Sequence, residues 1–140
     1  MSESLIKLRI SIPPVEGVED APIAAVAALA HKMGFSEDRV QNIIQALTEA
    51  CVNSILYTTP SEIDIEVVVT MTESSMIIEV RDQGPGFDPG NVMPPNFDEI
   101  MSNGTKNGGF GLHMIKELVD KLEIESSSTG TIVRMSAFLP

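Results

Sequence analysis

Glu49 and Asn53 are the first residues of this chain whose types and spacing indicate chemistry. They are four positions apart, so on a helix their side chains project from one face, one turn apart. The neutral amide oxygen of Asn53 suits a hard cation such as magnesium, which keeps few protein ligands and several waters. The carboxylate of Glu49 can accept a proton from an attacking hydroxyl or water. An ordinary solvated helix face would show the same spacing.

A second candidate site lies in a glycine-rich turn directly after a predicted strand. Asp82 ends the strand, and the turn continues as Gln-Gly-Pro-Gly-Phe, with glycines at Gly84 and Gly86. A carboxylate at a strand end can accept a hydrogen bond from an exocyclic amine such as that of adenine. Glycines let the backbone approach a flat ligand closely. A plain turn would have the same composition.

A third candidate is a run of glycines that opens a predicted helix. The segment Gly108–Leu112 reads Gly-Gly-Phe-Gly-Leu. Glycines before a helix amino terminus expose several backbone N–H groups beside the positive end of the helix dipole, which is a ready anion site. Lys106 lies just before this run, and its ammonium can pair with a phosphate. A flexible linker into a helix is the other interpretation.

Hydrophobic periodicity predicts the elements that position these residues. The expected strands are Leu5–Ile12, Glu62–Thr72, Ser75–Asp82, Lys121–Ser126 and Thr131–Leu139, and the expected helices begin at Asp20 as N-cap, at Ser36, and near Leu112. The second helix carries an apolar stripe with a period of about 3.6 residues and runs to about Tyr57. This order predicts an α+β fold, a two-layer α/β sandwich with helices on one face of a mixed, largely antiparallel sheet.

Composition restricts the partners and the compartment. The 140 residues suit a single domain spanning the whole chain. The net charge of −11 argues against nucleic acid and anionic membrane as partners, and it requires a nucleotide site to supply its own positive elements. Cys51 is the single cysteine, and the chain shows neither a secretory signal nor a membrane span. We therefore expect a cytoplasmic protein.

The three candidate sites occur in an order that resembles the histidine-kinase-like (GHKL, Bergerat-fold) ATPase domains. The similar motifs are Glu49-x-x-x-Asn53 for the N box, Asp82-x-Gly84-x-Gly86 for the G1 box, Gly109-x-Gly111 for the G2 box, and Gly130-Thr131 on the last hairpin. The match covers nearly the whole chain, and a lone domain of this length is similar to the bacterial anti-sigma-factor serine kinases of partner-switching systems.

The resemblance implies roles for the matched positions. Asn53 would ligate magnesium, Glu49 would act as general base, and Asp82 would read adenine with help from Thr131. The other residues that would shape the nucleotide site are Gly84, Gly86, Phe87, Lys106, Gly108, Gly109, Phe110, Gly111 and Leu112. The segment from about Asp88 to Asn107 would form the ATP lid.

The resemblance further implies a function and its partners. The domain would bind Mg²⁺ and ATP and phosphorylate a serine or threonine of an antagonist, an anti-anti-sigma protein of the STAS type. A sigma factor would be its other partner, and the domain would be a homodimer.

Two departures from the family pattern leave alternatives open. Tyr57 stands where these kinases often carry histidine, and Asn107-Gly108 stands where many carry an arginine that neutralises phosphate. Nucleotide binding should survive both changes, but phosphoryl transfer depends on them more directly. The main alternative is a non-catalytic ATP-binding module that sequesters a regulatory protein. A catalytic fragment of a histidine kinase is less favoured, because residues 1–14 read as a strand and not as dimerisation helices.

Overall fold

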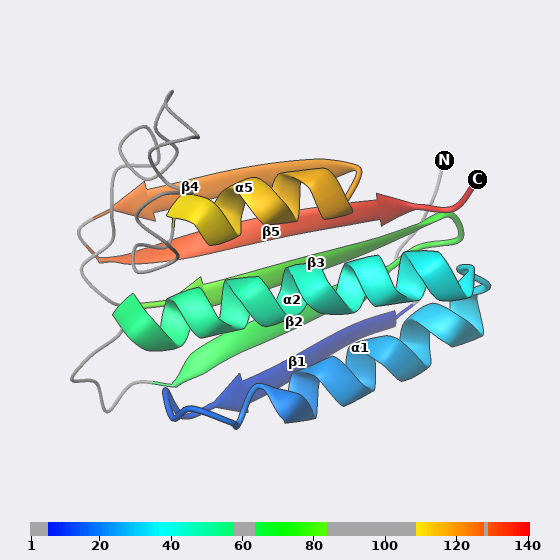
Figure 1. Ribbon diagram of the computed structural model, residues 1–140. Coiled ribbons are helices and arrows are strands. Elements are labelled where there is room, and N and C mark those ends of the chain that lie inside the picture. The colour runs from blue at the N-terminus through cyan, green and yellow to red at the C-terminus, as the bar shows by residue number, and fades with distance from the viewer. Residues whose placement is uncertain (1–5, 58–63, 84–108, 128) are drawn as a thin grey trace.

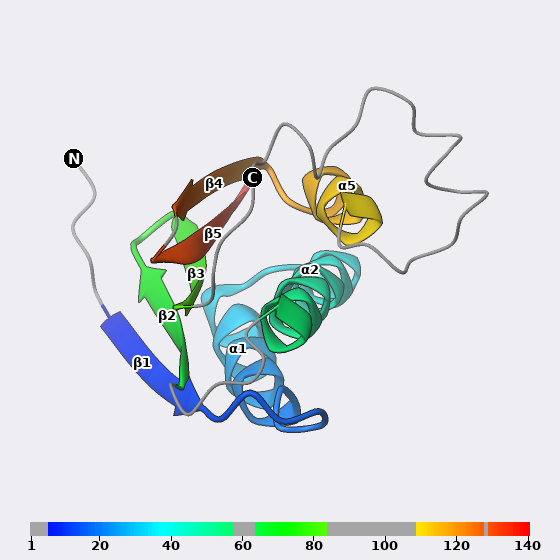
Figure 2. The same cartoon turned by 90° about the vertical axis from the view of Figure 1, so that its left-hand side faces the viewer.

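The computed structural model describes residues 6–57, 64–83, 109–127 and 129–140. Its elements are β1 (Ile6–Ile12), α1 (Asp20–Met33), α2 (Glu37–Tyr57), β2 (Ile65–Met71), β3 (Ser75–Asp82), α5 (Gly109–Leu118), β4 (Lys121–Ser127) and β5 (Gly130–Phe138). Figures 1 and 2 show the described helices side by side on one face of a single sheet. The predicted α+β sandwich is therefore confirmed. None of the described helices is long and apolar enough to cross a lipid bilayer.

The sheet has the strand order β1-β2-β3-β5-β4. All four pairings between described strands are antiparallel, so this sheet is antiparallel throughout rather than mixed. β3 is the central strand, and its last residue, Asp82, lies opposite Thr131 near the start of β5. The register therefore brings the G1-like aspartate next to the threonine of the last hairpin.

The helix boundaries agree with the sequence at most ends. Gly34 caps α1 with φ +99°, and its N–H donates to carbonyl oxygens of the last turn, as a left-handed C-cap requires. Ser36 precedes α2, and its Oγ accepts a hydrogen bond of 3.3 Å from the N–H of Arg39. The prediction that Asp20 is the N-cap of α1 was wrong. Glu19 occupies that position, and its carboxylate accepts from the N–H of Gly17 instead of capping the helix.

One core lies between the helices and the sheet. The apolar stripe of α2 forms its centre, with Val40, Ile43, Leu47 and Cys51 all at most 1% exposed. Burying each large aliphatic side chain contributes about 1.5–3 kcal/mol. Burial also raises the pKa of the Cys51 thiol to about 12, so this cysteine stays protonated and packs as an apolar residue.

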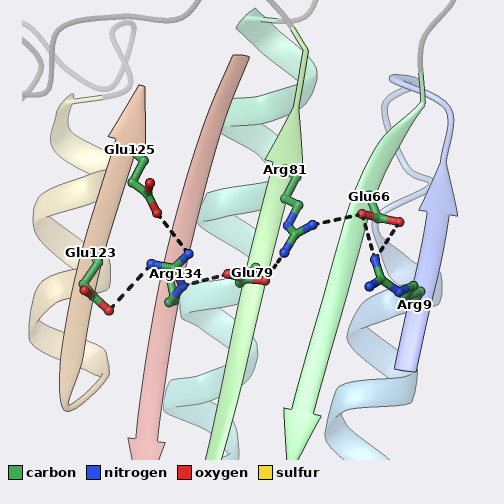
Figure 3. A network of polar contacts seen from close by, with 7 residues as sticks. All are labelled: Arg9, Glu66, Glu79, Arg81, Glu123, Glu125 and Arg134. Carbon is green, nitrogen blue, oxygen red and sulfur yellow. Dashed lines mark hydrogen bonds and ion pairs between the residues drawn. The ribbon is translucent and has the colours of Figure 1, made fainter. Parts of the chain in front are cut away.

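The opposite face of the sheet carries a ladder of ion pairs (Figure 3). Arg134 and Arg81 both contact Glu79, at 2.7 and 2.6 Å. Glu66 continues the ladder by pairing with Arg81 and with Arg9, at 3.6 and 3.4 Å. Alternation along each strand thus separates an apolar face under the helices from a charged outer face.

Candidate functional site

Three element ends that carry the predicted motifs lie at one end of the molecule. In Figure 1 the carboxyl ends of α2 and β3 and the amino end of α5 all point to the left of the view. α2 packs against both α5 and β3, so this helix links the other two elements. The fold therefore brings together the ends of α2, β3 and α5, which carry the N-box-like pair, Asp82 and the G2-like glycines and are far apart in the sequence.

Among the described residues, Asp82 is the charged residue that is buried. It is only 8% exposed, although it is an acid at the end of a strand. Its Oδ2 accepts a hydrogen bond of 3.1 Å from Oγ of Ser54, a residue of α2 that is 3% exposed. A buried carboxylate needs such donors, because removing an ionised group from water is costly unless it is hydrogen-bonded. A carboxylate kept in this position can read a donor group on a ligand.

The last hairpin holds the backbone of Asp82 from the other side. Gly130 packs so closely on β3 that a Cβ added there would overlap the carbonyl oxygen of Asp82. Thr131, which is 2% exposed, lies directly across from Asp82, and its Oγ1 is hydrogen-bonded to Oγ of Ser126 over 2.9 Å. The pair Gly130-Thr131 therefore serves a packing need, since only glycine fits the close approach.

Glu49 and Asn53 lie on the part of α2 next to its buried face. Both side chains are half-buried, and Ala50 and Ser54, which follow them directly, are buried. The predicted helix and the one-turn spacing of the pair are thus present. The carboxylate and the amide are accessible enough to meet a ligand and sheltered enough to be oriented.

These residues fit a magnesium ion that is bound together with a phosphorylated ligand. Among the described residues, no group of three or more His, Cys, Asp or Glu is placed to hold a metal. Magnesium needs no such cage, because it is commonly bound by one or two protein oxygens together with substrate phosphates and waters. Among the described residues at this end, the half-buried Asn53 carries an amide oxygen of the kind that suits that arrangement.

The glycine run forms the first turn of α5. The helix begins at Gly109, so Gly109, Phe110 and Gly111 are helical residues, earlier than the expected start near Leu112. Leu112 is 1% exposed and belongs to the core. Its burial anchors the turn. The N–H groups of a first turn have no partner within their own helix, and those of α5 lie at the site end, where they can face an anion.

Several predicted site residues lie outside the described residues. They are Gly84, Gly86, Phe87, Lys106, Gly108 and the lid segment 88–107. The contribution of these residues to the nucleotide site stays a prediction.

A hollow of about 710 Å³ opens beside Asp82 towards the outer face of the sheet. Its lining includes Glu66 and Arg81 of the ion-pair ladder, together with Glu125 and Asp64. Three of these four lining residues are acids and one is an arginine. The hollow therefore repels a triphosphate. The helix side of Asp82 is therefore the better candidate for the nucleotide.

Ser54 is the site residue that sequence reasoning missed. It follows Asn53 directly, and it lies seven residues after Leu47, on the buried stripe of α2. A serine at an apolar position of such a stripe must find a buried partner. A polar residue at this apolar position was the feature of the sequence that could have indicated Ser54 as a site residue.

Comparison with known proteins shows which family this chain is similar to. The family model described as the histidine kinase-like ATPase domain matches residues 18–137. A serine-protein kinase RsbW from Bacillus licheniformis is 30% identical over 119 residues, covering 81% of this chain and 74% of the relative. The serine-protein kinase RsbW of Bacillus velezensis is 26% identical over 148 aligned positions, covering 99% of this chain and 89% of the relative.

Solved structures share the fold at lower identity. A Mycobacterium tuberculosis protein, crystallised as its RsbU and RsbW domains, superposes with a TM-score of 0.70 at 16% identity. The match covers 96% of this chain and 33% of that longer chain. The histidine kinase domain of a blue-light activated kinase from Erythrobacter litoralis superposes with a TM-score of 0.53 at 17% identity, covering 91% of this chain and 65% of that one. Fold, motif order and sequence similarity agree, and the chain belongs to the histidine kinase-like ATPase domain family.

Proposed function

We propose that this domain binds Mg-ATP and transfers the terminal phosphoryl group to a serine or threonine of an antagonist protein. The antagonist would be an anti-anti-sigma protein of the STAS type, and a sigma factor would be the second partner. The observation that carries the proposal is the juxtaposition of the α2 motif with a buried, hydrogen-bonded Asp82 and the amino end of α5. Relatives named serine-protein kinase RsbW support the protein substrate.

Each residue would have one task. Asp82 would accept a hydrogen bond from the base amine, and the first-turn N–H groups of α5 would face the phosphates. Asn53 would hold magnesium through its amide oxygen. Mg-ATP, when bound, would supply the phosphoryl group and an electrophilic phosphorus. Such transfer depends mainly on positioning and on electrostatic stabilisation.

Glu49 would act on the acceptor hydroxyl. Its carboxylate would orient the hydroxyl and accept its proton as the oxygen–phosphorus bond forms and ADP leaves. A general base of this kind typically contributes about 10²–10⁴-fold to the rate. Replacing Glu49 should therefore lower phosphorylation much more than it lowers ATP affinity.

Calorimetry with ATP, with and without magnesium, tests the nucleotide site. Asn53→Ala should abolish most of the magnesium-dependent binding. Gln45→Ala is the matched control, because Gln45 is an exposed amide two turns earlier on α2. Equal affinity of Asn53→Ala and wild type would contradict the metal-ligand role, and absence of binding to wild type would remove the proposal altogether.

Phosphorylation of the antagonist with labelled ATP tests the transfer step. Glu49→Gln should lose transfer while it keeps ATP binding, and Glu73→Gln, at an exposed turn between β2 and β3, should lose neither. Equal transfer by wild type and Glu49→Gln would exclude Glu49 as the base.

The non-catalytic module remains the second candidate, because Tyr57 and Asn107-Gly108 depart from the kinase pattern. Nucleotide-dependent partner binding without any phosphate transfer would favour it. Phosphoserine or phosphothreonine on the antagonist would reject it.

A further inference from the structure

We propose that Ser54 is a positioning residue that holds the carboxylate of Asp82 for reading the exocyclic amine of the base. This inference rests on the nucleotide site proposed above. Oγ of Ser54 donates to Oδ2 of Asp82 over 3.1 Å, and both residues are more than 90% buried. A hydroxyl that donates to an ionised carboxylate makes a stronger hydrogen bond than a neutral pair does.

The hydroxyl of Ser54 has a local alternative that it does not use. Serine and threonine inside helices commonly donate to the carbonyl oxygen four residues earlier. Thr48 of the same helix does so, with Oγ1 at 2.8 Å from the carbonyl oxygen of Ile44. The hydroxyl of Ser54 instead donates its hydrogen bond to the carboxylate of Asp82, 28 positions along the chain. Its direction is therefore set by the contact between α2 and β3, and not by the helix.

The side chain of Asp82 has a soft torsion that the bond from Ser54 restricts. The backbone of Asp82 is already held in the centre of the sheet by pairing with Thr131 and by close packing of Gly130. Rotation about the Cβ–Cγ bond of an aspartate is broad and nearly two-fold, so the backbone alone does not orient the two oxygens. The bond from Ser54 to Oδ2 restricts this torsion and thereby the direction of the carboxylate oxygens.

This arrangement predicts how the base is selected. A fixed carboxylate oxygen accepts from the amino group of a 6-aminopurine, whereas a 6-oxopurine such as guanine would set an acceptor oxygen against it. An acceptor that faces another acceptor is unfavourable in a buried site. Ser54 should therefore increase affinity only for nucleotides that carry the amino group.

The test compares two nucleotides that differ in that group alone. Calorimetry with magnesium would measure ATP and purine riboside triphosphate, which lacks the 6-amino group, against wild type and Ser54→Ala. We expect Ser54→Ala to weaken ATP binding about tenfold, and to change binding of the analogue by less than about twofold, because the analogue does not use the carboxylate. The preference for ATP over the analogue should fall accordingly.

Ser136→Ala is the matched control. Ser136 is 5% exposed, and its partner on β3 is Ile77 rather than Asp82. The Ser136→Ala variant loses a buried serine hydroxyl that lies away from the Asp82 carboxylate. Its affinities for ATP and for the analogue should therefore equal those of wild type. Ser54→Cys keeps the size of the side chain with a weaker donor, and it should lower the preference for ATP by an intermediate factor, which keeps the test available if Ser54→Ala does not fold.

The possible outcomes separate this inference from the proposed function. Equal weakening of both nucleotides in Ser54→Ala would overturn the inference and assign Ser54 to packing. An unchanged affinity for ATP in Ser54→Ala, or an unchanged preference in Ser54→Cys, would overturn it as well. Absence of binding of either nucleotide to wild type would instead overturn the nucleotide site itself.

Discussion

Arg39 at the start of α2 and Asp120, which follows α5, form an ion pair of 2.5 Å between Nη2 and Oδ2. The same Oδ2 accepts a hydrogen bond of 2.7 Å from the N–H of Phe138 at the end of β5. One carboxylate thus ties the amino end of α2, the carboxyl end of α5 and the last strand together. In Figure 1 the amino end of α2 and the carboxyl end of α5 lie at the right of the view, opposite the helix ends that carry the motifs. This contact holds in relative position the two helices whose other ends carry Asn53 and Gly109.

Asp120→Asn should lower the free energy of unfolding by about 1 kcal/mol at neutral pH, because the pair is partly exposed and one hydrogen bond is charge-assisted. The backbone hydrogen bond from Phe138, and then the contact with Arg39, lower the pKa of Asp120 below its ordinary value, against the effect of burial. Because the folded-state pKa is lowered, the contribution of Asp120 to the free energy of unfolding is present above about pH 4. It is lost as the pH falls through the folded-state pKa. Urea unfolding across this range should show the wild-type and variant curves converging in acid. Asp64→Asn, an exposed matched change, should have little effect, and a loss from Asp120→Asn that did not depend on pH would contradict the assignment.

Glu79→Gln should destabilise the outer face more than Glu66→Gln does. Glu79 is bonded to both Arg81 and Arg134, and its side chain is 13% exposed, whereas the side chain of Glu66 is 34% exposed and its ion pairs are longer. We expect a loss of about 2 kcal/mol for Glu79→Gln and less than about 1 kcal/mol for Glu66→Gln. Chemical denaturation measures both, and equal losses would show that burial does not distinguish the two acids.

The effect of Glu79→Gln should also depend on pH. Burial raises the pKa of Glu79, but hydrogen bonds from Arg134 and Arg81 outweigh it, so the net pKa is lowered. The contribution of Glu79 is therefore present above about pH 4.3 and is lost as the pH falls through the lower folded-state value.

Gly130→Ala should cost more stability than Gly17→Ala, although both glycines have positive φ, +157° and +99°. Alanine at Gly17 meets open space and bears only the backbone strain, about 1 kcal/mol. Alanine at Gly130 would in addition overlap the carbonyl oxygen of Asp82, which should add about 1–3 kcal/mol and weaken ATP binding. Thermal unfolding and calorimetry measure the two effects. Equal costs at the two sites would mean that β3 and β5 separate easily.

His31 should titrate above its ordinary pKa because its Nε2 lies 2.7 Å from Oε2 of Glu37. The hydrogen bond with Glu37 is the main cause of the raised pKa, with a further contribution from the carbonyl oxygen of Ala27. The stabilisation of the fold by protonated His31 is therefore complete below about pH 6.5. It is lost as the pH rises through the higher folded-state pKa. NMR titration of His31 should show the pKa falling in Glu37→Gln and staying high in Asp38→Asn, the exposed neighbour. An unchanged pKa in Glu37→Gln would exclude the pair in solution.

Local patterns were sufficient to predict most elements and to place the candidate residues on them. The strand Ser75–Asp82 was predicted with its observed bounds, because alternating apolar residues must share one face of a sheet. The expected helix starts failed where capping or packing decided the end. Glu19 took the place of Asp20 at α1, and α5 begins at Gly109 although glycine is a weak helix former. Packing of Leu112 and Ile115 in the core favours that first turn over the propensity of its residues.

The sequence by itself determined the order of the elements, the face that each buries, the residue types of the three motifs and the family. Periodicity and motif spacing are local properties, so they can be read without knowing which elements meet. Only the tertiary structure decided which distant residues touch. The bond between Ser54 and Asp82 and the pair of Arg39 and Asp120 join residues 28 and 81 positions apart. Such contacts depend on how the helix layer packs on the whole sheet, and no local pattern records that packing.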